Sequence, residues 1–272
     1  MQDISLLHDL GIKFVLVPGS HVQTDELLTE KGCEPKYVGK YRITDPDSLK
    51  ASMDSAGRIS QIIQSKLSTT VACGNFLAAK KRGVVEGIDY KSTGEVKKID
   101  VSRIRESLDS DSIVILSNIG HSSSGEILNC NTYEVATACA MAIRAEKLIC
   151  IIDGPILDEM GHVIRFLSLE DVDRFKKIEI ATNYVSAIGD EDRNNSDSNS
   201  GCSARFRNGI GFDFDHGNLS ELASVCRGGV ERVHLVDGNI SGVLLKELFQ
   251  KDGIGTLVAS AKLVEVMCSH KT

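Results

Sequence analysis

The chain has 272 residues and a formal net charge of −7, and 42% of its residues are hydrophobic, which is enough to bury a core and excludes a wholly disordered chain. The acidic balance argues against a general nucleic-acid or anionic-membrane partner, because both require a basic face. No apolar run reaches the ~18 residues that a membrane-spanning helix needs.

The N-terminal segment does not resemble an export signal, and the spacing of the cysteines does not match a metal-binding motif. The first residues, MQDISLLHDLGIKF, carry two Asp before the first Lys and resemble neither a secretory signal nor a basic transit peptide. The eight cysteines are scattered, without a CxxC pair or a Cys/His cluster at zinc spacing. We therefore expect reduced thiols in a reducing compartment and no metal site, with Cys150 in the core.

The first half of the chain alternates strand and helix. Its predicted elements are, in order, a buried strand at 12–19, a helix at 22–32, a longer helix at 48–68 and a second buried strand at 111–120. The strands are the apolar runs IKFVLVPG and DSIVILSNIG, each of which ends in glycine. Ser48 is the expected N-cap of the longer helix.

The second half continues this alternation. Its predicted elements are an Ala-rich helix at 131–147, a strand at 147–157, a strand at 230–238, a helix at 241–253 and a last strand at 255–260. Strands separated by helices form βαβ units, so we expect one α/β domain over 1–272 with a mainly parallel central sheet. Residues 189–209 are polar and without periodicity, and we expect a disordered loop there.

Ligand groups in an open parallel sheet gather at the C-terminal ends of its strands. Gly19 and Ser20 precede a helix N-terminus that suits an anion, although a tight turn explains the same residues. Asn129 and Asn131 are placed either to donate to a carboxylate or amide or to act as turn and N-cap residues. The glycines of ELFQKDGIGT either approach a ligand closely or close a turn.

Six segments occur in an order that resembles a known family. They are PGSHVQTDELL, GKYRITD, GVVEGIDYKSTGEVKKID, NIGHSSSGEILNCNTYEVATACA, LICIIDGPILDEMGHVI and RVHLVDGNISGVLLKELFQKDGIGTLV. This order resembles the amino-acid kinase domain of plant and bacterial N-acetylglutamate synthases and, more distantly, acetylglutamate kinase. The resemblance implies a three-layer amino-acid kinase fold and a role in arginine biosynthesis, in which acetyl-coenzyme A acetylates L-glutamate. It also implies a homo-oligomer in the chloroplast, or otherwise in the cytoplasm, with L-arginine as a feedback inhibitor.

The resemblance also assigns a substrate-like pocket for L-glutamate or N-acetylglutamate. Arg42, in KYRIT, matches the kinase arginine that grips the substrate carboxylate, and a guanidinium fork suits a carboxylate. Asn129 and Asn131 match the first two residues of the kinase motif Asn-x-Asn-x-Asp. Gly19 and Ser20 match the kinase glycine loop and complete the pocket.

Departures from the kinases predict a chain without kinase activity and without catalytic residues of its own. Tyr133 stands where the motif holds a catalytic carboxylate, and a phenol of pKa ~10 does not replace that charge at neutral pH. Only Gly19 remains of the triple-glycine loop. The first strand of the kinases, with its phosphate-gripping lysine, has no counterpart, so the chain begins at the helix that should follow it.

Near the C-terminus the resemblance implies a site for L-arginine. Glu247 would meet the cationic amino acid, with Gly253 and Gly255 in the adjoining turn, while the relatives' nearby histidine is Gly242 here. The run QKDGIG also matches the loop by which acetyltransferases hold coenzyme A, but a helix precedes it and a strand follows it. We therefore expect no cofactor in this chain, and acetyl-coenzyme A for the full-length family.

The leading hypothesis is the amino-acid kinase-like domain of an N-acetylglutamate synthase, regulatory or structural and inactive alone. No C-terminal acetyltransferase domain is expected, because the chain ends soon after Gly255. One alternative is an acetylglutamate kinase that phosphorylates N-acetylglutamate with ATP. The other is a non-catalytic arginine-binding or oligomerisation module.

Overall fold

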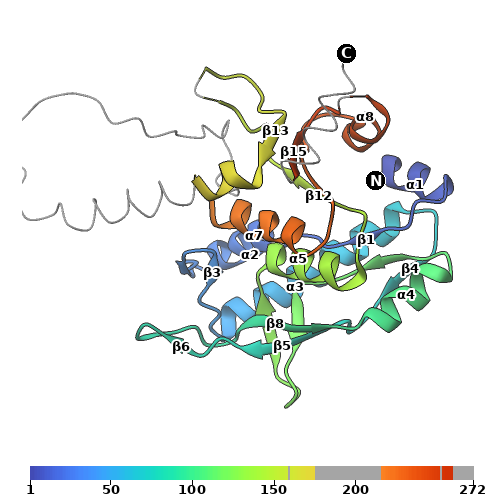
Figure 1. Ribbon diagram of the computed structural model, residues 1–272. Coiled ribbons are helices and arrows are strands. Elements are labelled where there is room, and N and C mark those ends of the chain that lie inside the picture. The colour runs from blue at the N-terminus through green and yellow to red at the C-terminus, as the bar shows by residue number, and fades with distance from the viewer. Residues whose placement is uncertain (159, 175–215, 252, 260–272) are drawn as a thin grey trace, which may run out of the picture. The chain divides into compact units, whose positions relative to one another are not determined.

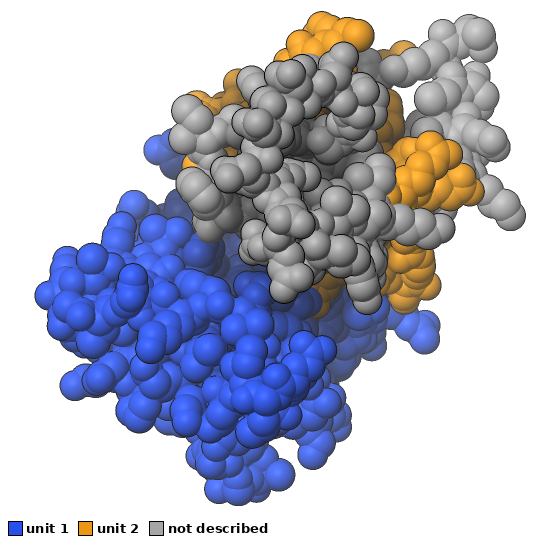
Figure 2. Space-filling view, turned by 90° about the vertical axis from the view of Figure 1, so that its left-hand side faces the viewer, with its two compact units in different colours: residues 1–145 blue, residues 146–272 orange. Residues whose placement is uncertain are grey.

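The computed structural model describes residues 1–158, 160–174, 216–251 and 253–259 (Figure 1). The chain forms two compact units, residues 1–145 (unit 1) and 146–272 (unit 2), coloured blue and orange in Figure 2. The sequence favoured a single domain, and its composition marks no boundary at this position. The predicted disordered loop at 189–209 lies outside the described residues.

Four of the five helices of unit 1 confirm predicted ones, whereas α4 was not predicted. The five helices are α1 (Gln2–Asp9), α2 (His21–Glu30), α3 (Pro46–Lys66), α4 (Val101–Asp109) and α5 (Thr132–Ile143). The expectation that Ser48 caps α3 is wrong, because Asp45 is the N-cap and accepts a hydrogen bond from the Ser48 amide at 2.8 Å. Aspartate followed by Pro46 at the first helical position is the stronger start signal.

A parallel sheet in unit 1 consists of short strands. They are β1 (Val15–Leu16), β9 (Ile113–Ile115) and β4 (Val71–Cys73), in the order β1-β9-β4. β1 and β9 confirm two predicted strands, and every residue of β9 is buried. The predicted strand at 111–120 is in fact two strands, because the chain leaves this sheet after β9 and enters β10 (Ile119–His121).

Four further strands of unit 1 close into a barrel that the sequence analysis did not predict. They are β5 (Leu77–Lys81), β8 (Thr93–Ile99), β10 and β11 (Ile127–Cys130), in the order β10-β11-β8-β5. Two glycines permit the close approach: a Cβ on Gly94 would lie 2.8 Å from the Leu128 Cβ, and one on Gly120 would lie 2.9 Å from the Ala79 Cβ.

Two antiparallel hairpins complete the strands of unit 1. β2 (Tyr37–Val38) pairs with β3 (Tyr41–Arg42), and β6 (Val84–Val85) pairs with β7 (Ile88–Asp89). Figure 1 shows the β6 hairpin extending outward beyond β5 and β8. The β2–β3 hairpin carries Arg42, a residue of the predicted substrate-like pocket.

The core of unit 1 joins the barrel, the parallel sheet and the helices that cover them. Its buried cluster is Phe76, Leu77, Ala79, Ile99, Ile104, Val114, Leu116, Leu128, Cys130, Val135 and Cys139. Burying each large apolar side chain of this kind stabilises the fold by roughly 1.5–3 kcal/mol. This core holds the ends of β10 and β11, and therefore the polar residues that lie there, in fixed positions.

The described part of unit 2 contains a four-stranded sheet, two helices with defined bounds and a further helical stretch at 169–174. The strands are β12 (Lys147–Ile152), β14 (Arg232–Asp237), β15 (Thr256–Ala259) and β13 (Phe166–Ser168), in that order, and the helices are α7 (His216–Arg227) and α8 (Val243–Phe249). β12 with β14 and β13 with β15 are parallel pairs, whereas β14 and β15 are antiparallel. All four elements predicted at 147–157, 230–238, 241–253 and 255–260 are present with shorter bounds.

The α/β class is confirmed, because helices connect parallel strands in both units. The strand pairing of the described residues stays within each unit, so the parallel strands expected in one central sheet are divided between a three-stranded and a four-stranded sheet. Cys150 lies in the core as expected, and burial raises the pKa of its thiol to about 12.

The described residues contain neither a membrane-spanning helix nor a cluster of metal-binding side chains. None of their helices is long and apolar enough to span a membrane. Within the same part of the chain, no group of three or more His, Cys, Asp or Glu side chains is arranged to hold a metal ion.

Candidate functional site

The loop between β1 and α2 places the first predicted site residues. Ser20 is the N-cap of α2 and is buried, and its hydroxyl donates to Asn118 Oδ1 at 3.2 Å. A Cβ on Gly19 would lie 3.5 Å from His21 Nδ1, which is an ordinary contact. Ser20 therefore belongs to a buried polar network, whereas nothing in the described packing requires glycine at position 19.

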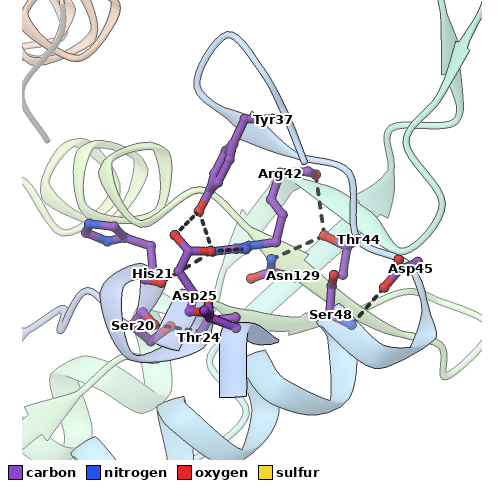
Figure 3. A network of polar contacts seen from close by, with 11 residues as sticks. Ser20, His21, Thr24, Asp25, Tyr37, Arg42, Thr44, Asp45, Ser48 and Asn129 are labelled. Carbon is purple, nitrogen blue, oxygen red and sulfur yellow. Dashed lines mark hydrogen bonds and ion pairs between the residues drawn. The ribbon is translucent and has the colours of Figure 1, made fainter. Parts of the chain in front are cut away.

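Arg42, on β3, is the charged centre of the substrate-like pocket (Figure 3). Its side chain is only 5% exposed, and its Nη1 donates to Asp25 Oδ1 at 2.5 Å. Its Nη2 donates to the Tyr37 hydroxyl and to the carbonyl oxygen of His21, the latter at 3.3 Å. The guanidinium carbon lies 4.6 Å from the centroid of the Tyr37 ring, which adds a cation–π contact. The predicted carboxylate-binding group is thus already bound to a carboxylate of the protein.

Asp25, in the second turn of α2, is a site residue that the sequence analysis missed. Its Oδ2 accepts a hydrogen bond from the Tyr37 hydroxyl at 2.9 Å, so both of its carboxylate oxygens are engaged. Its side chain is 32% exposed, far more than that of Arg42. The one available signal was an acid inside the predicted helix TDELL, and such an acid is usually assigned to a solvated face.

The side chains of Asn129 and Asn131 hydrogen-bond to different parts of the protein. Asn129, at the end of β11, accepts from Asn118 Nδ2 at 2.9 Å and donates to Thr44 Oγ1 at 3.2 Å, and it is buried. Asn131 is the N-cap of α5: its Oδ1 accepts from the Tyr133 amide at 2.9 Å, and its Nδ2 donates to the Lys40 carbonyl at 2.9 Å. Of the two roles left open by the sequence, the N-cap role is confirmed for Asn131.

A chain of neutral side chains connects Asn129 with Arg42. The Thr93 hydroxyl donates to the Arg42 carbonyl at 2.5 Å and contacts the Thr44 hydroxyl at 3.0 Å, and Thr44 is fully buried. Buried polar groups are costly unless they are hydrogen-bonded, so each member of this chain depends on its neighbours. The buried Arg42 guanidinium is therefore connected through its own backbone to a network of neutral, hydrogen-bonded side chains.

Glu247, on α8 in unit 2, is the centre of the predicted arginine site. Its side chain is 4% exposed, and its Oε2 accepts hydrogen bonds from the amides of Ile254 and Gly255 at 2.7 and 2.8 Å. Its Oε1 lies 2.6 Å from Nδ1 of His234, on β14. The structure thus brings Glu247 together with the glycine turn as predicted, and adds His234, which was missed.

Both glycines of this turn are required, Gly253 by the Glu247 carboxylate and Gly255 by the backbone of β14. Gly253 has φ +59°, and a Cβ on it would lie 2.7 Å from Glu247 Oε2. A Cβ on Gly255 would collide with the carbonyl oxygen of Leu235. The turn therefore wraps around Glu247 with bare backbone, and α8 ends at Phe249 rather than at 253 as the sequence predicted.

Burial and hydrogen bonds determine the charge of Glu247 at the predicted arginine site. Burial alone would raise the pKa of Glu247, but hydrogen bonds from His234, Gly255 and Ile254 lower it below its usual value, so the side chain is a carboxylate at neutral pH. His234 Nε2 is buried and has no hydrogen-bond partner in the structure described here. Gly242, the N-cap of α8, has φ +70°, a backbone conformation that strains a side chain such as the relatives' histidine.

Comparison with known proteins assigns the family. Residues 1–192 match the sequence model of the amino acid kinase family, which is more than half of the chain. The chain belongs to the amino acid kinase family. Its α/β fold with parallel strands is accordingly an amino-acid kinase fold.

Curated relatives of this amino acid kinase family member are amino-acid acetyltransferases. That of Pseudomonas syringae pv. syringae is 34% identical over 272 residues, which cover 95% of this chain and 56% of the relative. That of Vibrio vulnificus (strain CMCP6) is 36% identical over 284 residues, which cover 98% of this chain and 59% of the relative. The chain thus spans little more than half the length of these proteins.

Solved structures of similar fold include a two-ligand complex of one such enzyme. N-acetylglutamate synthase from Neisseria gonorrhoeae, complexed with coenzyme A and L-arginine, matches 94% of this chain and 56% of its own with a TM-score of 0.76 and 28% identity. Its complex with coenzyme A and N-acetyl-glutamate matches with a TM-score of 0.77. Carbamate kinase from Giardia lamblia, at 9% identity, has a TM-score of 0.56 and covers 95% of this chain and 88% of its own.

Proposed function

We propose that this chain is the amino-acid kinase-like part of an N-acetylglutamate synthase, that it binds L-arginine as a regulatory ligand and that it has no kinase activity. The observation that carries the proposal is identity of 34–36% over 95–98% of the chain with amino-acid acetyltransferases. The acetylation of L-glutamate by acetyl-coenzyme A would then be the activity of the whole protein, and this chain would regulate it.

The proposed lack of kinase activity is supported by the hydrogen bonds that Asn131 already makes and by the presence of Tyr133. Asn131 uses its amide group to cap α5 and to hold the Lys40 carbonyl. Tyr133, in the first turn of α5, occupies the position that resemblance assigns to a catalytic carboxylate. Phosphoryl transfer depends on charges placed to neutralise the moving phosphate, and a phenol does not supply such a charge at neutral pH.

Arginine binding is supported by the turn around Glu247. A carboxylate offers about four acceptor positions, and three are occupied here, by His234 and by the amides of Ile254 and Gly255. The remaining position and the negative charge suit a guanidinium or ammonium group, as do the carbonyl groups of the turn. The Neisseria gonorrhoeae synthase of similar fold was crystallised with L-arginine.

The experiment is a titration of the purified chain with L-arginine by calorimetry and by thermal unfolding. L-citrulline is the matched control ligand, because it has almost the same shape and no side-chain charge. We expect saturable binding of L-arginine alone, with a stabilisation of roughly 2.7 kcal/mol at 100 times the dissociation constant. Glu247→Gln should remove this response, whereas Glu231→Gln, at an exposed position, should keep it.

A coupled assay for ADP separates this proposal from the kinase alternative. With N-acetylglutamate and ATP, we expect no ADP above the blank. Robust formation of ADP would instead make the chain an acetylglutamate kinase. If neither ADP formation nor arginine binding occurs, the chain acts as a structural or oligomerisation module and the regulatory proposal is wrong.

A further inference from the structure

The ion pair between Arg42 and Asp25 is unequally buried. The Arg42 side chain is 5% exposed, whereas that of Asp25 is 32% exposed. A buried guanidinium needs a counter-charge, because an unpaired charge in the interior is strongly destabilising. The more exposed carboxylate has no such need, since water can solvate it. Arg42 therefore depends on a carboxylate more strongly than Asp25 depends on Arg42.

The Arg42 donor that binds Asp25 belongs to a guanidinium that has further contacts of its own. Arg42 Nη2 is held by the His21 carbonyl and by the Tyr37 hydroxyl, and its guanidinium lies over the Tyr37 ring. The backbone carbonyl of Arg42 accepts from the buried Thr93 hydroxyl. The remaining Arg42 donor and the Tyr37 hydroxyl then point at the two oxygens of one carboxylate (Figure 3). Departure of Asp25 would leave this two-donor clamp in place.

We infer that Asp25 is an internal pseudo-ligand, a specificity-determining residue whose carboxylate occupies the donors of Arg42 and Tyr37 and thereby excludes small carboxylic acids from them. An acid that entered would have to displace Asp25 toward solvent, where its side chain already has access. Its apparent affinity would equal its intrinsic affinity multiplied by the fraction of molecules in which Asp25 has left. The inference concerns contacts within unit 1 only and is independent of arginine binding at Glu247.

The chemistry of the clamp selects one class of excluded ligand. One guanidinium donor and one phenol hydroxyl match the two oxygens of a carboxylate at the spacing that Asp25 adopts. A dianion such as phosphate is a poorer fit, because Asp25 stays on the same helix nearby after it turns away and repels the second charge. Monocarboxylate groups are therefore the ligands that Asp25 competes with most directly.

The test is chemical rescue of Asp25→Ala by acetate and by N-acetylglycine, each of which carries a single carboxylate. The variant should melt at a lower temperature than the parent chain, and either carboxylate should restore the melting temperature saturably. Acetamide and chloride at equal ionic strength should not. The double variant D25A/R42M should show no rescue, and the parent chain should bind the same carboxylates at least tenfold more weakly than Asp25→Ala. Arginine binding by Asp25→Ala, measured in parallel, reports separately on the function proposed above.

Two results would overturn the inference. Folded Asp25→Ala without any carboxylate-dependent shift would make the pair a plain structural ion pair, and equal carboxylate affinity in parent and variant would show that Asp25 excludes nothing. If Asp25→Ala folds poorly, its folded yield should rise when acetate is added during refolding, and a yield indifferent to acetate also contradicts the inference. Asp25→Asn serves as the second variant, for which carboxylate binding should again exceed that of the parent chain.

Discussion

The two predicted ligand sites differ in what holds their charged groups. In unit 1, Arg42 is held by a side chain, Asp25, that is 32% exposed and can rotate. In unit 2, Glu247 is held by the backbone amides of Ile254 and Gly255, seven and eight residues further along the chain. Rotating a side chain toward water is a local change, whereas withdrawing backbone amides requires the whole turn to rearrange.

We call the Arg42 site exchangeable, because a side chain holds its charged group. We call the Glu247 site committed, because backbone amides hold its charged group. The Glu247 carboxylate determines the shape of its turn, so a ligand there must be received in addition to the existing hydrogen bonds. The Arg42 guanidinium has a partner of the same chemistry as a ligand carboxylate, so a ligand there must replace an existing bond. We expect substitutions and pH to affect the Arg42 site and the Glu247 site differently, and the largest effect is expected at the ion pair of unit 1.

Removing either partner of the unit 1 ion pair should give unequal losses of stability. Asp25→Ala leaves a buried guanidinium uncompensated and should lower the free energy of unfolding by about 3 kcal/mol. Arg42→Met fills the same volume and leaves a carboxylate that water can solvate, so about 1 kcal/mol is expected. Urea unfolding followed by near-UV circular dichroism measures both, because four of the five tyrosines lie within residues 1–145.

Glu26→Ala is the matched control for this pair of variants, because Glu26 is the next residue on the same helix and is exposed. It should change the free energy of unfolding by no more than about 0.5 kcal/mol. Equal losses for Asp25→Ala and Arg42→Met would mean that exposure does not decide which partner depends on the other, and the contrast between the two sites would then fail.

Glycine-to-alanine substitutions should distinguish the two sites next. Gly253→Ala combines a positive φ with a Cβ placed 2.7 Å from Glu247 Oε2, so it should cost about 2 kcal/mol. Gly19→Ala introduces only an ordinary contact with His21, so its effect should stay within about 0.5 kcal/mol. Thermal unfolding of the two variants beside the parent chain measures both. A near-neutral Gly253→Ala would show that the turn is not committed to Glu247.

The sequence predicted elements well where one period of apolar residues dominated. The helices α2, α3 and α5 and the strands β12, β14 and β15 each show such a pattern, and each was expected. The barrel was missed, because β10 and β11 have only three and four residues and, besides pairing with each other, pair with β5 and β8, which lie far away in the sequence. Strands this short have too few residues to establish an alternating pattern.

The site residues were predicted only as single charged or polar groups. Arg42 and Glu247 were chosen by resemblance, but Asp25 and His234, which pair with them, were not. Asp25 is 17 residues from Arg42 and on a different element, so only the tertiary fold brings them together. For His234 a signal was present, because a histidine within the apolar strand VERVHLVDG needs a buried polar partner.

Acidification should release the Glu247 turn. Although burial opposes it, the hydrogen bonds from His234, Gly255 and Ile254 lower the pKa of Glu247 in the folded chain below about 4.3, its value in an unfolded chain. The stabilisation is therefore fully present above that pH and is lost as the pH falls through the folded pKa. The amide chemical shifts of Ile254 and Gly255, followed by NMR between pH 6 and pH 3, should titrate with that lowered midpoint.

Glu247→Gln provides the comparison for this titration. The glutamine keeps an oxygen that can accept from an amide but has no proton to gain in this range, so the same two resonances should lose the titration. If the parent chain titrates at or above about 4.3, the backbone amides do not stabilise the carboxylate, and the committed character of this site is refuted.

The smallest expected effect concerns Asn131, a residue of the predicted pocket in unit 1 whose side chain hydrogen-bonds to backbone groups. Its Oδ1 accepts from the amides of Tyr133 and Glu134 at 2.9 and 3.2 Å, and its Nδ2 donates to the Lys40 carbonyl. Asn131→Ala removes all three bonds and should lower the free energy of unfolding by about 1 kcal/mol, the usual cost of an N-cap. Asn131→Asp keeps both amide acceptors and adds a charge favoured at a helix N-terminus, so it should lose less than alanine. Urea unfolding by near-UV circular dichroism ranks the three chains. If aspartate loses as much as alanine, the bond to Lys40, which both variants lack, rather than the helix cap is the main contribution of Asn131.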